Sequence, residues 1–257
     1  MPDESVIPAA VLAQRIADVR RRMAAAVQAA GRPSGQVTAL LATKTQTPAT
    51  IRAAVEALAA GADHPAGAPV LIGENRVQEL TAKAGDLHDL TAAARISTHL
   101  IGPLQRNKIN AVLASPAACI QSVDSLPLAQ AISSRCLRAG RTMNVMVQVN
   151  VSDEASKSGV APHDALALAL AVALLPGLRL TGLMTIGAHT SDQAVIRRGY
   201  ACLREIRDAV QASGAPGTEA AHHLSMGMSS DLELAIAEGA SMVRIGSAIF
   251  GSRPTTH

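Results

Sequence analysis

Aromatic side chains are almost absent from this chain, which has one Phe, one Tyr and no Trp among 257 residues. Proteins that bind single-stranded nucleic acids stack the bases on aromatic rings, and this chain lacks the rings for it. The net charge is only +3. The one basic run, Arg20 to Arg22, lies in a helical pattern that we interpret as a solvated helix face. The composition argues against nucleic acid as a partner, and the core must be aliphatic.

Cysteines and long apolar runs are also scarce. Cys119, Cys136 and Cys202 are far apart and have neither CxxC nor Cys/His metal spacing. We therefore predict reduced thiols in a cytoplasmic protein, and no metal site. The longest apolar run, Ala165 to Leu175, is too short to span a membrane, and the N-terminal MPDESVIPAA has no apolar core of signal-peptide length. We expect no association with membranes.

Lysine is scarce although the chain has 23 Lys and Arg residues, because only Lys44, Lys83, Lys108 and Lys157 are lysine. Arginine is the default cation, so a lysine suggests a place where arginine would not serve. Only lysine can lose its proton and attack a carbonyl as a free amine. Lys44 is the strongest candidate, since it ends the apolar run in VTALLATKTQTP.

Short apolar segments alternate with helical patterns along most of the chain. Strands are predicted at Val37–Thr43, Pro69–Ile72, Arg95–Ile101, Cys119–Ser122, Asn144–Val151, Arg179–Met184, Ala221–Leu224 and Ser241–Ile245. Helices are predicted at Ala9–Ala30, Pro48–Ala60, Glu74–Ala84, Leu104–Leu113, Leu126–Ala139, Pro162–Leu175, Asp192–Ala212 and Asp231–Glu238. This order predicts an α/β protein, a single (β/α)8 TIM-type barrel with an extra N-terminal helix, forming one domain over residues 1–257. An open doubly wound sheet is the alternative.

Lys44 is expected at the mouth of this barrel, because the chemistry of such barrels lies on loops after the strands. Side chains alternate between the two faces of a strand, so Lys44 shares a face with Ala42 and Leu40. If Leu40 fills the interior, Lys44 points into the mouth, and the small Ala42 beneath it leaves room.

The last two strands are followed by segments that suit a phosphate group. In HLSMGMSSDLE, Ser225 and Ser229 offer hydroxyls and Gly227 permits close approach of the backbone. In MVRIGSAIFGS, Gly246 and Ser247 offer a tight turn, amides and a hydroxyl. Two such loops at neighbouring strand ends, opposite a lysine from the first strand, predict a phosphate cradle.

Arg244 is the last inward position of the eighth strand and also reaches the mouth. It either forms an ion pair that closes the rim or faces a ligand. A lysine, a phosphate cradle and an arginine together suit pyridoxal phosphate. Arginine can only donate a hydrogen bond to an unprotonated pyridine nitrogen, which weakens the ring as an electron sink.

Several segments resemble one family: LLATKTQTP, IGENRVQEL, HLIGPLQRNKIN, VNVSDEASKSGV, LTGLMTI and LSMGMSSDLELAIAEGASMVRIGSAIFGSR. From Leu12 to Arg253 the sequence resembles the pyridoxal phosphate homeostasis proteins, which have the barrel of alanine racemase. The resemblance implies that Lys44 carries the cofactor as a Schiff base and that Arg244 faces the pyridine nitrogen. It further places Ser225, Gly227, Gly246 and Ser247 around the phosphate and Asn75 beside the ring.

The sequence departs from the family pattern at a few places. Ala42 stands where Val is usual, Thr43 where Ser is, Arg76 where Tyr is, and Gly187 where Pro is. An insertion-like ADHPAGAP, Ala62 to Pro69, lengthens the second connection. These changes affect the packing around the outer face of the cofactor.

Two functions share this cofactor. One is a non-catalytic protein that stores, delivers or buffers pyridoxal phosphate, with apoenzymes that need it as possible partners and a monomer or weak dimer as its state. The alternative is an amino-acid racemase or decarboxylase. Alanine racemases use a tyrosine near a second domain as the second acid/base, whereas Tyr200 lies on a predicted outer helix and this chain lacks that domain. We favour the carrier. A Schiff-base aldolase for sugar phosphates fits the residues, but not the family motifs.

Four further residues complete the expectations. Lys83 is predicted on a solvated surface, and Lys108 either closes the mouth or lies on the surface. Lys157, on a polar loop, is either exposed or a second site of cofactor linkage. His189, on the sixth loop, is a weaker candidate for a ligand contact.

Overall fold

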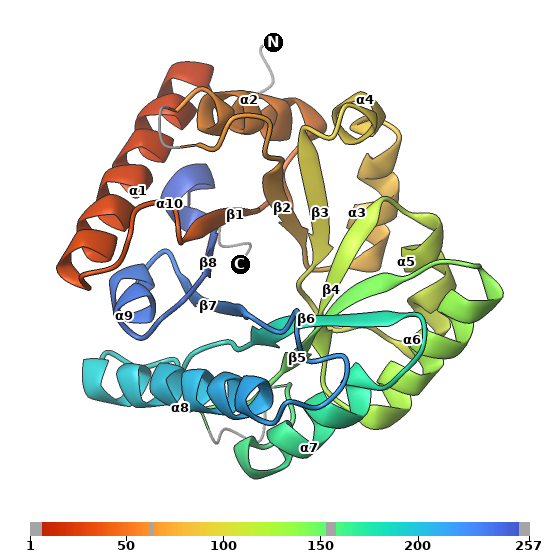
Figure 1. Ribbon diagram of the computed structural model, residues 1–257. Helices are drawn as coiled ribbons and strands as arrows, with labels where there is room; N and C mark the ends of the chain where they lie inside the picture. Colours follow the sequence, from red (N-terminus) through yellow and green to blue (C-terminus); the bar gives the residue numbers. More distant parts are fainter. Residues whose placement is uncertain (1–6, 62–63, 153–157, 252–257) are drawn as a thin grey trace, which may run out of the picture.

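Eight parallel strands form a closed barrel in the order β1 to β8, and helices surround it (Figure 1). The computed structural model describes residues 7–61, 64–152 and 158–251. The strands are β1 Thr38–Ala42, β2 Val70–Glu74, β3 Ile96–Leu100, β4 Ala117–Val123, β5 Met143–Gln148, β6 Leu178–Met184, β7 His223–Met228 and β8 Met242–Ile245. The pairing of β1 with β8 closes the sheet. The predicted (β/α)8 barrel is thereby confirmed.

The helices follow the strands around the barrel. They are α1 Ala9–Ala29, α2 Pro48–Ala59, α3 Val77–Ala84, α4 His88–Ala92, α5 Ile109–Ala114, α6 Leu126–Arg138, α7 Pro162–Ala173, α8 Gln193–Ala212, α9 Leu232–Ala237 and α10 Ser247–Phe250, with a 3-10 turn η1 at Arg106–Lys108. Helix α2 begins as its sequence predicts, because the Thr47 hydroxyl accepts a hydrogen bond from the Thr50 amide and Pro48 occupies the first turn. In the described part of the chain, no helix is both long and apolar enough to cross a bilayer.

The prediction for β7 was wrong at both ends. The strand runs from His223 to Met228, so Ser225 and Gly227 are strand residues and not loop residues. The pairing with β8 shifts register between Ser225 and Met228, where Gly227 has a φ of +88°. This irregularity explains the error, since a glycine inside an apolar run usually indicates the end of a strand.

The barrel interior is packed with aliphatic and sulfur-containing side chains. Its buried apolar residues are Leu40, Ala42, Ile101, Cys119, Met146, Met184 and Met242. Leu40 and Ala42 therefore face inward, as predicted from the alternation along β1. Tyr200 and Phe250 both belong to the larger layer between barrel and helices, so neither aromatic ring fills the interior.

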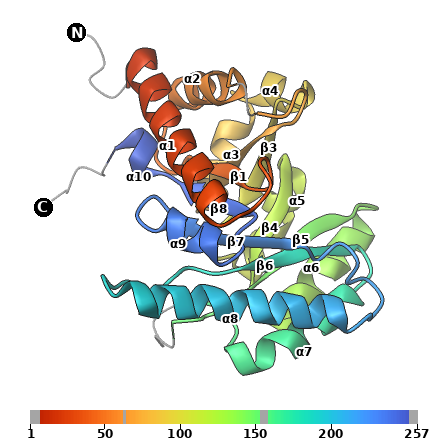
Figure 2. The same ribbon diagram turned by 60° about the vertical axis from the view of Figure 1, so that its left-hand side comes forward.

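Helix α1 lies across the seam between β1 and β8, where it packs on α2, α9 and α10 (Figure 2). Its arginines bind elements from the far end of the chain. Arg15 donates to the carbonyl of Ile249 at 3.0 Å, and Arg22 pairs with Glu233 at 2.7 Å. The interpretation of Arg20 to Arg22 as a merely solvated face was therefore wrong for Arg22.

Replacing Gly182 with Ala should destabilise the barrel by about 1–3 kcal/mol or more. A Cβ atom there would lie 2.0 Å from the carbonyl oxygen of His223 on the paired strand, and backbone cannot move aside cheaply. The matched control is Gly85→Ala, because Gly85 has helical dihedrals and nothing within 4 Å of an added Cβ. Urea unfolding of both variants measures the difference, and equal stabilities would contradict the close β6–β7 approach.

Candidate functional site

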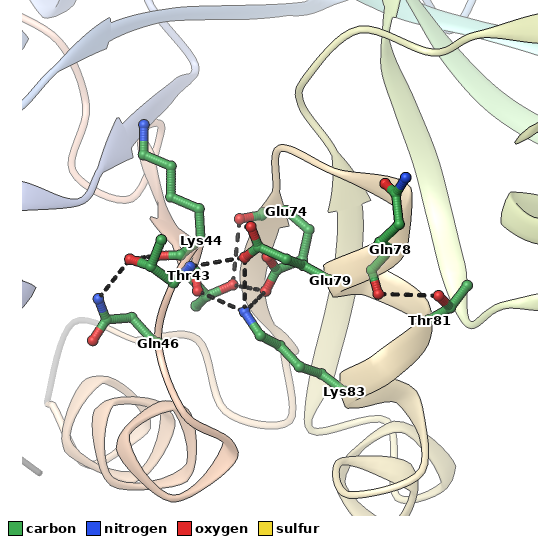
Figure 3. A network of polar contacts seen from close by, with 10 residues as sticks. Thr43, Lys44, Gln46, Glu74, Gln78, Glu79, Thr81 and Lys83 are labelled. Carbon is green, nitrogen blue, oxygen red and sulfur yellow. Dashed lines mark hydrogen bonds and ion pairs between the residues drawn. The ribbon is translucent and has the colours of Figure 1, made fainter. Parts of the chain in front are cut away.

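Lys44 follows β1 at the carboxyl end of the barrel and is half-buried. Below it, Ala42 and Leu40 occupy the interior, and Leu40 is the register partner of Arg244 on β8. Figure 3 shows the Lys44 side chain extending away from the cluster of acidic residues beside β1. The predicted lysine therefore stands at the mouth, above the inward face that it shares with Leu40.

The backbone on both sides of Lys44 is held by charged side chains from β2 and α3 (Figure 3). Before it, the Thr43 carbonyl accepts from Lys83 Nζ at 2.9 Å, and the Thr43 hydroxyl donates to Glu74 Oε1 at 2.6 Å. After it, the Thr45 amide donates to Glu79 Oε2 at 2.8 Å. Thr45 has a φ of 66°, a left-handed conformation that β-branched residues rarely adopt. The Glu79 contact holds this backbone in place, and the turn directs the chain into α2.

This network overturns the surface role predicted for Lys83. Its side chain is 13% exposed, and its ammonium bonds Glu74 at 2.9 Å and Glu79 at 3.3 Å. Glu74, the last residue of β2, is 2% exposed and has one carboxylate oxygen, Oε2, that lacks a hydrogen-bond partner. Burial raises the pKa of Glu74, while its bonds from Thr43 and Lys83 lower it. Lys83 is thus a buried partner that stabilises the charged form of Glu74 next to the Lys44 peptide.

Arg244 is 6% exposed in the barrel interior. Its guanidinium donates to the carbonyl of Ser225 at 2.8 Å, to the Ser225 hydroxyl at 3.0 Å and to the carbonyl of Thr185 at 2.7 Å. Among the described residues, all hydrogen bonds found for this guanidinium go to neutral oxygens. Within the described residues, the rim ion pair considered from the sequence is not found, and no carboxylate contacts Arg244 directly.

A chain of buried hydrogen bonds runs from Arg244 into the barrel. The Ser225 hydroxyl accepts from Arg244 and donates to Gln121 Oε1 at 2.7 Å. This contact orients the Gln121 amide, so its Nε2 donates to His99 Nδ1 at 2.7 Å. His99 is therefore neutral and carries its proton on Nε2. Burial agrees with this, because it lowers the pKa of His99 to about 4.

The structure brings some of the predicted phosphate residues together and separates others. The amides of Gly246 and Ala248 both donate to Ser229 Oγ, at 3.4 and 3.2 Å, and Ser247 is exposed beside them. Gly227 lies elsewhere, because its Cα packs against α9, where a Cβ would be 2.4 Å from that of Ala235. The hydroxyl of Ser225 points into the interior chain described above.

Asn75 follows β2 and is half-buried. Its backbone lies so close to Gly102 that a Cβ on Gly102 would be 2.1 Å from the Asn75 carbonyl oxygen. Gly102 in turn accepts a hydrogen bond from the buried Ser122 hydroxyl at 2.7 Å. The second and third connections therefore hold Asn75 at the mouth. Lys108 is half-buried in η1, and Lys157 lies outside the described residues.

A cavity of about 1100 Å³ lies between the loops that follow β6 and β7. His189 lines it, together with the exposed apolar side chains of Ile186 and Met228. The described residues contain no group of three or more His, Cys, Asp and Glu side chains arranged to hold a metal ion.

Tyr200 belongs to α8 but its side chain is fully buried. Its hydroxyl donates to Asp231 Oδ2 at 2.9 Å, and Asp231 Oδ1 accepts from the amide of Met228 at 2.6 Å. Burial and the Asp231 carboxylate raise the pKa of Tyr200 far above its usual range. The only tyrosine is thus a neutral structural phenol and is poorly suited to exchange protons at the mouth.

Comparisons with known proteins agree with this geometry. Residues 10–254 match the family described as alanine racemase, N-terminal domain. The pyridoxal phosphate homeostasis protein of Pseudomonas aeruginosa is 43% identical over 94% of this chain and 96% of its own length. The chain belongs to the pyridoxal phosphate homeostasis protein family. The family assignment made from the motifs is confirmed.

Two solved structures share the whole fold. A protein from Bifidobacterium adolescentis is 45% identical, with a TM-score of 0.87, covering 96% of this chain and 98% of that one. PipY of Synechococcus elongatus, solved with PLP bound, is 31% identical with a TM-score of 0.75, covering 93% of this chain and all of that one. This member of the family thus has the architecture of a protein that holds the cofactor.

Replacing Lys83 with Met should lower the free energy of unfolding by about 3 kcal/mol near neutral pH, because Glu74 would stay buried without its cation. The loss should shrink at about pH 5, since burial raises the pKa of Glu74 and the protonated acid needs no cation. Urea unfolding at both pH values measures this. Lys108→Met is the control. An equal loss of stability in the two variants would contradict the buried ion pair between Lys83 and Glu74.

The protein should lose stability as the pH falls from about 6.5 to 4 through the titration of His99. The neutral imidazole is required in the fold, and its pKa is depressed from 6.5 to about 4. The stabilisation is therefore complete above pH 6.5, the pKa of the unfolded state. It is lost as the pH falls through the folded pKa of about 4, by about 3 kcal/mol in total. In His99→Gln the decline over this interval should be shallower than in the wild type, whereas the exposed His88→Gln should match the wild type.

Proposed function

We propose that the chain binds pyridoxal phosphate through a Schiff base on Lys44 and serves intracellular homeostasis of this cofactor without turnover of its own. The observation that carries the proposal is that Lys44 follows β1 above the inward-facing Leu40 and Ala42, and that Arg244 on the neighbouring strand β8 is the register partner of Leu40. The family of homeostasis proteins and the PLP-bound PipY support it.

The residues at the mouth fit the cofactor in charge and in hydrogen bonding. Two backbone amides, of Gly246 and Ala248, already converge on one oxygen atom, which is the arrangement that a phosphate oxygen needs. Arg244 brings a positive charge, and its hydrogen-bond partners in the described part of the chain are neutral oxygens. We infer that Asn75 lies beside the ring and that Ser225, Gly227 and Ser247 support the phosphate end, Ser225 and Gly227 from β7, the strand that leads to Ser229.

The same residues favour holding the cofactor over using it. Pyridoxal phosphate, when bound, supplies an electron-withdrawing ring that stabilises negative charge on an attached carbon. Arg244 cannot give a proton to the ring nitrogen, since guanidinium stays charged in proteins. Tyr200, the only tyrosine, is buried against Asp231 and is not placed to move a proton at the mouth. A racemase or decarboxylase therefore remains the weaker function for this site.

A carrier implies partners that take the cofactor from it. We propose apoenzymes that require pyridoxal phosphate as the recipients, and the cytoplasm as the location, where the three free thiols would stay reduced. The partial exposure of Lys44 at the end of the barrel suits transfer, because its side chain is reached in part from solvent.

Replacing Lys44 with Ala should abolish the covalent linkage and preserve the fold. The side chain is half-buried at a polar mouth, so its loss should change the free energy of unfolding by only about 1–2 kcal/mol. Wild type incubated with pyridoxal phosphate and reduced with borohydride should gain the mass of one reduced cofactor, and the variant should not. Intact mass and a melting curve on the same samples measure both effects.

Lys108→Ala is the matched control and should keep the linkage. A reducible adduct in Lys44→Ala would show that another lysine anchors the cofactor, with Lys157 the first to examine by peptide mapping. Assays of the loaded wild type for racemisation and decarboxylation of amino acids test the second half of the proposal. Linkage at Lys44 together with efficient turnover would retain the site and reject the carrier function.

A further inference from the structure

A second cavity, of about 400 Å³, opens at the amino end of the barrel, on the opposite side from Lys44. All eight strands contribute to its lining, including the first residues of β1, β2, β7 and β8, which are Thr38, Val70, His223 and Met242. Its volume lies within the range of small-molecule sites. The amino end of such barrels usually contributes only to stability, whereas in this protein it contains a cavity.

The composition of the interior explains the hollow. Cys119, Met146 and Met242 form the apolar floor, at 3%, 1% and 4% exposure, and no aromatic ring fills the space above them. The side wall includes Pro65 and Ala68 from the insertion-like segment that lengthens the connection between α2 and β2. The described part of that insertion therefore borders this cavity.

The orientation of His99, a polar residue that lines the cavity, is fixed by Gln121, which lies outside the lining. His99 lines the cavity, and Gln121 donates to its Nδ1 at 2.7 Å, so its Nε2 carries the proton. The partner found for Nε2 is the Ser97 hydroxyl at 3.5 Å, at the limit of a hydrogen bond. The nearly buried imidazole thus offers a donor that a better-placed acceptor would satisfy.

The electrostatic character of the lining selects the charge of that acceptor. None of the described residues that line the cavity is Asp or Glu, whereas the lining includes the imidazoles of His64, His99 and His223, which can donate hydrogen bonds. Such a wall favours an anion over a cation. We propose that this cavity binds a small aliphatic carboxylate, whose oxygen accepts from His99 and Ser97 and whose carbon chain packs on the sulfur-rich floor.

This site is separate from the cofactor site. Gln121 and Ser225, both buried, stand between His99 and Arg244, so a ligand at the amino end does not touch the mouth. The inference therefore does not rest on the proposed function, and the cofactor residues Lys44 and Arg244 take no part in it.

The probe is 4-methylpentanoate, and 4-methylpentylamine is the comparison with the same carbon chain and opposite charge. In wild type labelled with carbon-13 at the methionine methyl groups, the carboxylate should shift the signals of Met146 and Met242, which line the cavity, and leave that of Met228 at the other end unchanged. Calorimetric titration should show binding at least about tenfold weaker for the amine. Equal binding of both probes, or shifts confined to Met228, would overturn the proposal.

A variant that fills the cavity completes the test. Leu71→Phe, at a partly buried lining position on β2, should weaken binding of 4-methylpentanoate at least about tenfold. The control Leu137→Phe adds the same ring at a 55% exposed position on α6 and should leave binding unchanged. Circular dichroism spectra and urea unfolding of both variants, compared with the wild type, verify their fold. Undiminished binding by Leu71→Phe, or no binding by the wild type, would reject the site.

Discussion

The charge of Arg244 directs the polar interactions of the barrel interior. A guanidinium can only donate, so the Ser225 oxygen accepts from it, and Ser225 and Gln121 donate in turn away from the mouth. The tautomer of His99, at the far end of this chain, follows from the orientation of the Gln121 amide. An interior built from small aliphatic and sulfur-containing side chains leaves room for these polar groups, since no Phe or Tyr ring occupies the centre.

Lysine is placed in this protein where arginine would fail, and two of its four lysines illustrate different reasons. Under the proposed function, the Lys44 position needs an amine that can release its proton at the mouth. Lys83 has to bond Glu74, Glu79 and the Thr43 carbonyl with three donors that diverge from one nitrogen, which a planar guanidinium cannot do from the same position. The second lysine thereby fixes the peptide that carries the first.

The repeating order of strands and helices made the barrel predictable, and the inward face of Leu40 and Ala42 followed from strand alternation. The same alternation predicted that Arg244 lies inward on β8, where it is buried. The buried role of Lys83 was not predictable, because α3 delivers it to Glu74 only after the barrel has closed. The predicted strand β7 ended too early because the Ser and Gly residues that follow Leu224 were interpreted as a loop, whereas Gly227 lies inside the strand. The cavity at the amino end depends on how all eight strands pack together, so no local sequence pattern predicts it.

Helix α1 is synthesised early, but its contacts with the end of the chain can form only late. Arg15 of the helix and Arg32, just after it, donate to carbonyls of Ile249 and Ala240, more than 200 residues further along the chain. The part of the helix that packs on α9 and α10 therefore leaves the ribosome uncovered and stays so until the end of the chain is synthesised. Contacts so distant in sequence slow folding and expose apolar surface to aggregation. The nascent chain should therefore depend on chaperones until β8 has paired with β1. The folded barrel, in which this surface is buried, shows no sign of that requirement.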